Sequence, residues 1–145
     1  MTDDSTQGLA PPHSKEAEQS VLGAVMLDDR ILDDLTGVLE PDDFYYPQHK
    51  QIFKSMLAMS GQPIDAVTVG EKNENVEFGY IIDIAETTPN TSSALAYAEI
   101  VKQKRAERDL LEVGHYFREL VGDISLTHQE RIDGAQSAFT SGVRS

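Results

Sequence analysis

Adjacent aspartates and histidines are the residues of this sequence most capable of chemistry. Adjacent acidic pairs such as Asp28-Asp29, Asp33-Asp34 and Asp42-Asp43 have carboxylate oxygens that can bind Mg²⁺. Because adjacent residues of a helix point in different directions, we interpret these pairs as solvated turn or helix-surface residues. The histidines are His13, His49, His115 and His128. None belongs to an H-E-x-x-H motif and no two are spaced i,i+4, so we expect surface or capping positions rather than metal ligands.

Sequence motifs for nucleotide binding and covalent catalysis are missing. The sequence holds no G-x-x-x-x-G-K-[ST] phosphate loop and no G-x-G-x-x-G turn. It also contains no cysteine, which excludes disulfides, thiolate metal sites and a cysteine nucleophile. We therefore predict no catalytic residue, no metal site and no cofactor.

The charge distribution disfavours nucleic acid as the main partner. The formal net charge is −13, and residues 1–46 hold eleven acidic but only two basic residues, which would repel a phosphate backbone. The bases Lys102, Lys104, Arg105 and Arg108 form the one basic cluster in the second half. We interpret this cluster as a solvated helix face with i,i+4 ion pairs such as Arg105 with Asp109. Binding to an acidic partner or weakly to single-stranded nucleic acid is the competing hypothesis.

Hydropathy and the N-terminal sequence predict an intracellular, cytoplasmic protein that does not enter a membrane. No apolar run approaches the roughly 18 residues that span a bilayer. Residues 1–10 are polar and acidic, without the apolar core of a signal peptide.

The elements that must position these residues are predicted to be helices, which makes the fold class all-α. A long helix over residues 92–121, about 45 Å in length, is the central element, with cap candidates at Asn90, Thr91 and Ser92. Before it we expect a first helix capped by Ser14. The helices expected before residue 92 span 14–27, 28–39, 47–59, a short segment within 64–69, and 78–86. The β-branched residues of 64–69 also suit a strand, but a lone strand would have no partner, so we favour a short helix capped by Asp65 or Thr68.

The apolar residues of the long helix change sides near its midpoint. Residues 94, 97, 100 and 101 form one stripe, and residues 106, 110, 113, 117 and 120 form another on nearly the opposite side. The second stripe has the three-and-four spacing of a helix–helix seam. The capping box Thr127-His128-Gln129-Glu130 predicts a further helix to about residue 139, which must fold back as an αα-hairpin.

These patterns predict a domain organisation and a self-associating surface. We expect a disordered acidic tail at 1–13, a globular helical head at 14–91, a hairpin at 92–140 and the start of a linker at 141–145. Two helices alone bury little surface, so part of the hairpin should pack against a second copy or another protein. The predicted self-association residues are Leu110, Val113, Phe117, Leu120, Ile132 and Phe139.

Four sequence blocks, in order over about a hundred residues, resemble the amino-terminal domain of the DnaB family of bacterial and phage replicative helicases. The first is Pro-Pro-His-Ser-Lys-Glu-Ala-Glu-Gln-Ser-Val-Leu-Gly at 11–23, and the second is Asp-Asp-Phe-Tyr at 42–45 with His49 and Ile52-Phe53. The third is Pro63-Ile64-Asp65 with Val67-Thr68. The fourth comprises Thr88-Pro89, Tyr-Ala-Glu-Ile-Val at 97–101, Arg108 and Leu110-Leu111.

The resemblance implies an all-helical head with a hairpin through which copies pair. The pairs would form a collar, a trimer of dimers, on a hexameric ring. It further implies binding of the carboxy-terminal domain of primase, a helicase loader as a further partner, and DNA contact mainly through an ATPase domain that this chain lacks. The alternative is a stand-alone decoy that inhibits a helicase ring. Carried over by motif position, the partner-contact candidates are Glu16, Tyr80, Leu111 and Phe117. The sequence departs from the family at residues 70–79, where a longer segment ending in Gly-Gly is usual.

Overall fold

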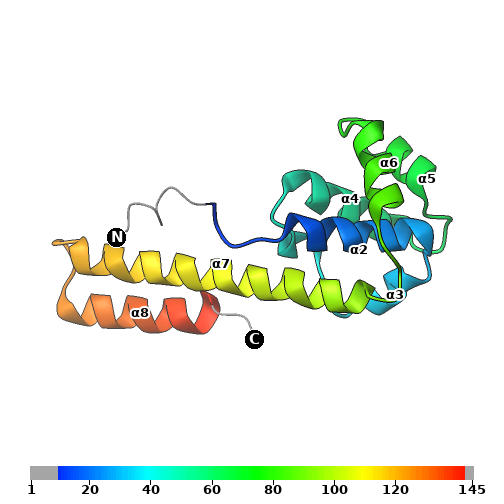
Figure 1. The fold of residues 1–145 in the computed structure, drawn as a ribbon. Coiled ribbons are helices and arrows are strands. Elements are labelled where there is room, and N and C mark those ends of the chain that lie inside the picture. The colour runs from blue at the N-terminus through cyan, green and yellow to red at the C-terminus, as the bar shows by residue number, and fades with distance from the viewer. Residues whose placement is uncertain (1–9, 143–145) are drawn as a thin grey trace. The chain divides into compact units, whose positions relative to one another are not determined.

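The structure is a computed structural model, and it describes residues 10–142 of the chain. All regular secondary structure in this part of the chain is helical, which confirms the predicted fold class. The described residues divide into two compact units, residues 13–103 and residues 10–12 with 104–142. The long helix α7 (Ala94–Gly122) contributes to both units and continues without a break through Arg105 (Figure 1).

The first unit packs short helices around α2 (Lys15–Leu27). Ser14 caps α2 as predicted, because its hydroxyl accepts a hydrogen bond from the backbone N–H of Ala17 at 3.2 Å. α2 packs against α3 (Ile31–Leu35), α4 (Pro47–Ala58) and α6 (Phe78–Thr87), while α5 (Ala66–Lys72) packs against α4 and α6. The 3₁₀ turn η1 (Pro41–Asp43) packs against α4. The fully buried side chains at the centre include Leu22, Phe44, Phe53 and Ile81.

The N-terminal end of α7 completes the core of the first unit. Ala94, Ala98 and Val101 are buried, whereas Ile100 is partly exposed. The helix starts two residues later than predicted, because the Asn90 side chain accepts a hydrogen bond from the Ser93 backbone N–H at 3.1 Å and holds a turn there. The first predicted apolar stripe is therefore only partly buried: Ala94 and Val101 lie in the core and Tyr97 is half-buried, but Ile100 is exposed, while Ala98, outside that stripe, is buried.

One glycine of α2 is required by its packing. A Cβ on Gly23 would lie 1.7 Å from Thr88 Oγ1 and 2.7 Å from the Ile84 carbonyl oxygen, so only glycine lets the backbones of α2 and α6 approach this closely. By contrast, Gly79 on α6 has nothing within 4 Å of a Cβ position.

The helix predicted over 28–39 is much shorter in the structure. α3 ends at Leu35, and the Thr36 hydroxyl donates to the Asp33 carbonyl at 2.9 Å. The backbone then closes into a turn in which Val38 N–H donates to the Leu35 carbonyl at 2.9 Å. A hydroxyl that bonds to the preceding turn, followed by the flexible Gly37, ends the helix although Val38 and Leu39 continue its apolar spacing.

The short helix predicted within 64–69 is confirmed and extends further. Asp65 Oδ1 accepts from the Thr68 backbone N–H at 2.9 Å, and Thr68 Oγ1 accepts from the Asp65 backbone N–H at 2.9 Å, which makes a reciprocal cap. Gly61, whose φ is 90°, takes the left-handed conformation that turns the chain after α4.

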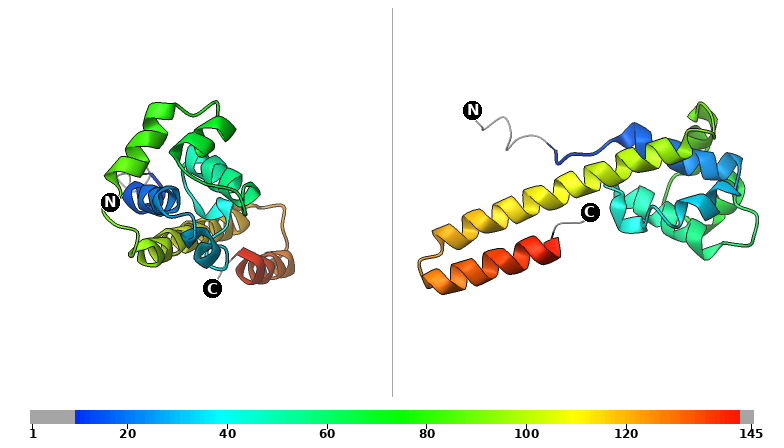
Figure 2. Two further views of the ribbon diagram at one scale, coloured as in Figure 1. Left: turned by 90° about the vertical axis from the view of Figure 1, so that its right-hand side faces the viewer. Right: turned by 90° about the horizontal axis from the view of Figure 1, so that it is seen from below.

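The second unit is an αα-hairpin formed by the C-terminal half of α7 and by α8 (His128–Gly142), which run antiparallel side by side (Figures 1 and 2). The predicted capping box is present: Glu130 N–H donates to Thr127 Oγ1 at 3.1 Å, and Thr127 N–H donates to Glu130 Oε1 at 2.8 Å. Arg131 fastens the turn by donating to the carbonyl oxygens of Leu120 at 2.8 Å and Asp123 at 2.7 Å.

Two expected chain-end segments differ from the structure. α8 continues to Gly142, so residues 141 and 142 are helical, and the rest of the expected linker lies outside the described residues. Most of the expected tail also lies outside them, but His13 is ordered: its ring stacks on that of Tyr45 with 4.2 Å between ring centroids. Within residues 10–142, no helix is long and apolar enough to cross a membrane.

Candidate protein interface

A buried polar network connects α2, α4 and α6 inside the first unit. His49 Nδ1 lies 2.7 Å from Glu18 Oε1, and His49 Nε2 lies 2.6 Å from the Tyr80 hydroxyl. Glu18 and His49 are 1% and 0% exposed. The second Glu18 oxygen accepts a hydrogen bond from the Tyr45 backbone N–H at 2.8 Å. Both ring nitrogens and both carboxylate oxygens thus have protein partners, as buried polar groups require.

This network corrects one prediction from the sequence. His49 is a core residue, not a surface or capping residue, and its partner Glu18, in the first turn of α2, is buried with it. The available signal was position: His49 precedes Ile52 and Phe53 by three and four residues, which places it on the apolar face of α4. Its partner could not be identified, because 31 residues separate it from Glu18.

Tyr80 is held in place by this network and reaches the edge of the core. It is half-buried, and its hydroxyl also accepts a hydrogen bond from Gln19 Nε2 at 3.2 Å. The ring of Tyr80 stacks on that of His49 with 5.9 Å between centroids. These contacts with His49 and Gln19 fix the orientation of the Tyr80 ring.

Gln19 links Tyr80 to a hollow that contains Glu16. This hollow has a volume of about 390 Å³ and is lined by Glu16, Gln19, Ser20, Thr87, Thr88 and Pro89. Glu16 is exposed at its edge. The structure therefore brings two of the four partner-contact candidates, Glu16 and Tyr80, to neighbouring positions through one intervening side chain.

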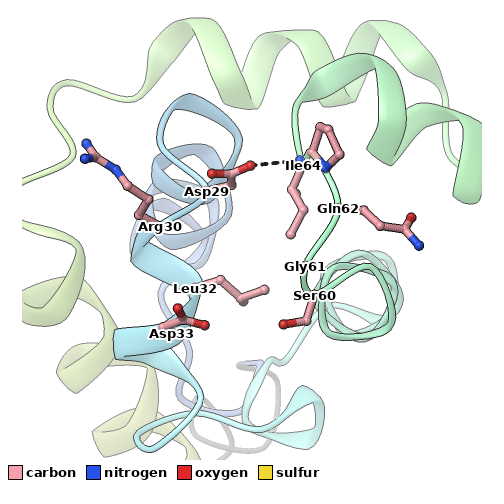
Figure 3. A pocket seen from close by; sticks show the side chains of 9 residues that line it. Asp29, Arg30, Leu32, Asp33, Ser60, Gly61, Gln62 and Ile64 are labelled. Carbon is pink, nitrogen blue, oxygen red and sulfur yellow. Dashed lines mark hydrogen bonds between the residues drawn. The ribbon is translucent and has the colours of Figure 1, made fainter.

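A second hollow, of about 410 Å³, lies between the start of α3 and the turn that follows α4 (Figure 3). Asp29 Oδ2 accepts from the Ile64 backbone N–H at 3.1 Å and joins its two sides. Arg30 extends away from Ile64 (Figure 3). It bonds to Asp28, with Nε at 2.9 Å from Oδ1. This hydrogen bond lowers the pKa of the Asp28 carboxyl and raises the pKa of Arg30. Among the described residues no group of three or more histidines and acids could hold a metal ion.

The hairpin divides the predicted self-association residues into two groups. Val113 and Leu120 are each 8% exposed and face α8, where Gly134 and Gly142 allow close contact. A Cβ on Gly142 would lie 2.7 Å from Val113 Cγ2, which the sequence pattern did not indicate. Val113 and Leu120 therefore form the seam inside one hairpin.

The other four predicted self-association residues keep part of their apolar surface in contact with solvent. Leu110 is 54% exposed, Phe139 62% and Ile132 41%, while Phe117 is half-buried. We call these four residues the hairpin flank. Several large apolar side chains exposed on a two-helix unit are typical of a surface that another protein covers.

Leu111 lies on a different side of α7 from this flank. It is 57% exposed and lines a hollow of about 290 Å³ with Pro11, Arg108, Glu112 and His115. Arg108 Nη1 donates to the Pro12 carbonyl oxygen at 2.8 Å. Two separate faces of the hairpin unit, the flank and the Leu111 face, thus carry the remaining partner-contact candidates.

The basic cluster is largely used within the chain. Arg105 pairs with Asp109 at 3.3 Å, as predicted, and Lys104 pairs with Glu107 at 3.4 Å. Together with the Arg108 bond to Pro12, these contacts leave the cluster less suited to gripping a phosphate backbone than its sequence suggested.

The helical fold, with its enclosed polar network and its exposed apolar side chains, defines the class: an all-helical domain without a recognisable catalytic centre among the described residues. The chain belongs to the DnaB-like helicase N-terminal domain family, whose model matches residues 10–103. It is 38% identical over 118 residues to the replicative DNA helicase DnaB of Pasteurella multocida, covering 75% of this chain and 25% of that protein. It is 40% identical over 124 residues to DnaB of Haemophilus influenzae, covering 79% and 26%. The chain thus spans about a quarter of the length of these relatives, and the match is to their helicase N-terminal domain.

Solved structures of the same domain resemble this fold. The N-terminal domain of DnaB helicase from Mycobacterium tuberculosis superposes with a TM-score of 0.84 at 30% identity, covering 92% of this chain and 100% of that one. The N-terminal domain of DnaB helicase from Helicobacter pylori, described together with its interactions with primase, gives a TM-score of 0.64 at 26% identity, with 74% and 91% covered.

Proposed function

We propose that this chain is a non-catalytic assembly and docking domain of a replicative DNA helicase, which pairs through its hairpin and binds primase in DNA replication. Membership of the DnaB-like helicase N-terminal domain family supports a role as part of a replicative helicase. The single observation that carries the self-association is the hairpin flank, whose exposed apolar side chains are more than a two-helix unit can cover by itself.

In this proposal copies pair flank to flank, and three pairs form a collar when an ATPase domain assembles a hexamer. Leu110, Phe117, Ile132 and Phe139 make the contact between copies, while Val113 and Leu120 hold each hairpin closed. DNA is contacted mainly by the ATPase domain, and a helicase loader is a further partner. Such a function would place the protein in the cytoplasm with the chromosome.

Primase is the proposed second partner, since a structural relative from Helicobacter pylori is described with its primase interactions. Glu16 and Tyr80 would form one contact region on the first unit, where the Glu18–His49 pair fixes the tyrosine. Leu111 and Phe117 would contribute from the hairpin. The domain boundaries at 14–91 and 92–140 are part of the same proposal.

Sedimentation equilibrium of the chain and of single variants tests the self-association. Leu110→Asp and Phe139→Asp should shift the monomer–dimer equilibrium toward monomer, because each places a charge within the apolar contact. Val67→Asp is the matched control: Val67 is 59% exposed on α5 of the first unit, so the same charge change there should leave association unaltered. A parent chain that remains monomeric up to millimolar concentration would contradict hairpin pairing.

Isothermal titration with the carboxy-terminal domain of the cognate primase tests the second partner. Glu16→Ala and Leu111→Asp should weaken binding, whereas Val67→Asp should not. Purified protein should also show no ATP hydrolysis, and measurable turnover would refute the non-catalytic assignment.

Nucleic-acid binding remains the less favoured function. Lys104, Arg105 and Arg108 already bond to groups of the chain, and the formal net charge is −13. Tight, salt-sensitive binding to single-stranded DNA in a filter assay would promote it over the docking function.

A further inference from the structure

The N-terminal segment of the chain lies against the face of α7 that contains Leu111. Residues 10–12, which we call the strap, run along this helix, and the Pro12 carbonyl oxygen accepts a hydrogen bond from Arg108 Nη1 at 2.8 Å. Pro11 lines the same hollow as Leu111, Glu112 and His115. All of these residues belong to the second unit, so the contact is internal to it.

The chemistry of the strap suits a contact that forms and separates readily. The Ala-Pro-Pro sequence is held extended by its proline rings and therefore loses little conformational freedom on docking. Its prolines meet an apolar surface while a carbonyl oxygen meets a cation, which is how extended proline segments are bound elsewhere. Coverage is nevertheless partial, since Pro11 is exposed and Leu111 remains 57% exposed.

We infer that the strap is a removable cover of the Leu111 face, which limits the access of any ligand to that face. For the primase interaction this inference rests on the proposed function, in which Leu111 is a contact. A partner that fills the hollow beside Leu111 must displace the strap, because Pro11 lines that hollow. The apparent affinity of such a partner is therefore its intrinsic affinity multiplied by the fraction of molecules in which the strap is released.

Access to this face can be measured without any partner, because the chain has no cysteine. In the full chain, His115→Cys places a single thiol in the hollow that the strap lines, and its rate of reaction with a water-soluble disulfide reagent reports access. Gly114→Cys is the matched reporter, since it lies one residue earlier on α7 and nothing lies within 4 Å of its Cβ position.

Two sets of variants release the strap from opposite sides. Arg108→Met removes the donor to Pro12, while Pro11→Gly with Pro12→Gly keeps that donor and makes the strap flexible. Both should raise the reaction rate of the His115→Cys reporter several-fold and leave that of the Gly114→Cys reporter unaltered. Lys104→Met, which removes the same charge one turn earlier, should change neither rate. Equal rates for the His115→Cys reporter in all backgrounds would overturn the inference.

Titration of the same variants with the carboxy-terminal domain of primase then separates this inference from the proposed function. The strap-releasing variants should bind roughly three- to thirty-fold more tightly than the parent, as expected when a competing intramolecular contact is removed. Binding of unchanged strength in both sets would refute the competition. If no variant binds primase, the proposed function fails, while the thiol rates still decide whether the strap covers Leu111.

Discussion

Replacing Glu18 by alanine is the most informative perturbation of the buried network. The change removes the acceptor for the Tyr45 backbone N–H at 2.8 Å and the partner of His49 Nδ1 at 2.7 Å, in a site that is 1% exposed. Each buried polar group left without its partner costs about 1–3 kcal/mol, so the two lost partners together cost about 2–6 kcal/mol. We therefore expect Glu18→Ala to lower the free energy of unfolding by that amount, a large share of the roughly 5–15 kcal/mol of a typical domain.

The assay is urea denaturation followed by far-ultraviolet circular dichroism, because the chain has no tryptophan. Glu16→Ala is the control on the same helix. Its carboxylate is exposed in the first turn of α2, where the helix dipole favours a negative charge, so its loss should cost about 0.3–1 kcal/mol. Glu18→Gln should fall between the two, since an amide oxygen can still accept the Tyr45 bond. If Glu18→Ala is no more destabilising than Glu16→Ala, the reasoning about the network is refuted.

Three further predictions follow from local geometry. Gly23→Ala should destabilise the protein by about 1–3 kcal/mol, because the added Cβ would crowd α2 against α6. Gly79→Ala, in open space, should instead stabilise it by about 0.5–1 kcal/mol. Denaturant midpoints measure both changes, and equal effects would contradict the close approach of α2 and α6. Thr127→Ala should cost about 1 kcal/mol of hairpin stability by removing the cap of α8, and hydrogen exchange should show the loss confined to that helix. The Arg30 hydrogen bond lowers the folded-state pKa of Asp28 below the ordinary value of 3.8, so the stabilisation it provides is present above pH 3.8 and is lost as the pH falls through the lowered pKa. In a carboxyl NMR titration, Arg30→Met should raise the Asp28 pKa, and an unaltered midpoint would refute the pairing.

The sequence was sufficient wherever the determining interaction is local. The cap at Ser14 and the box at Thr127 join residues three apart, so their side-chain types alone indicate where helices begin. The long helix and its change of apolar side follow likewise from the 3.6-residue period. Local signals also misled once: the apolar spacing of Val38 and Leu39 extended a helix that Thr36 and Gly37 end.

Only the tertiary structure decided which side chains meet across the sequence. Glu18 and His49 are ordinary surface residues by type, and their burial depends on a pairing across 31 residues that no periodicity encodes. The same holds for the placement of Val113 against Gly142 and for the contact between Pro12 and Arg108, which spans 96 residues. The composition and period of this chain thus determine its helices and the faces they must hide. Which polar groups are paired and which apolar faces stay open is decided by long-range packing, because burial is a property of the assembled helices and not of any one segment.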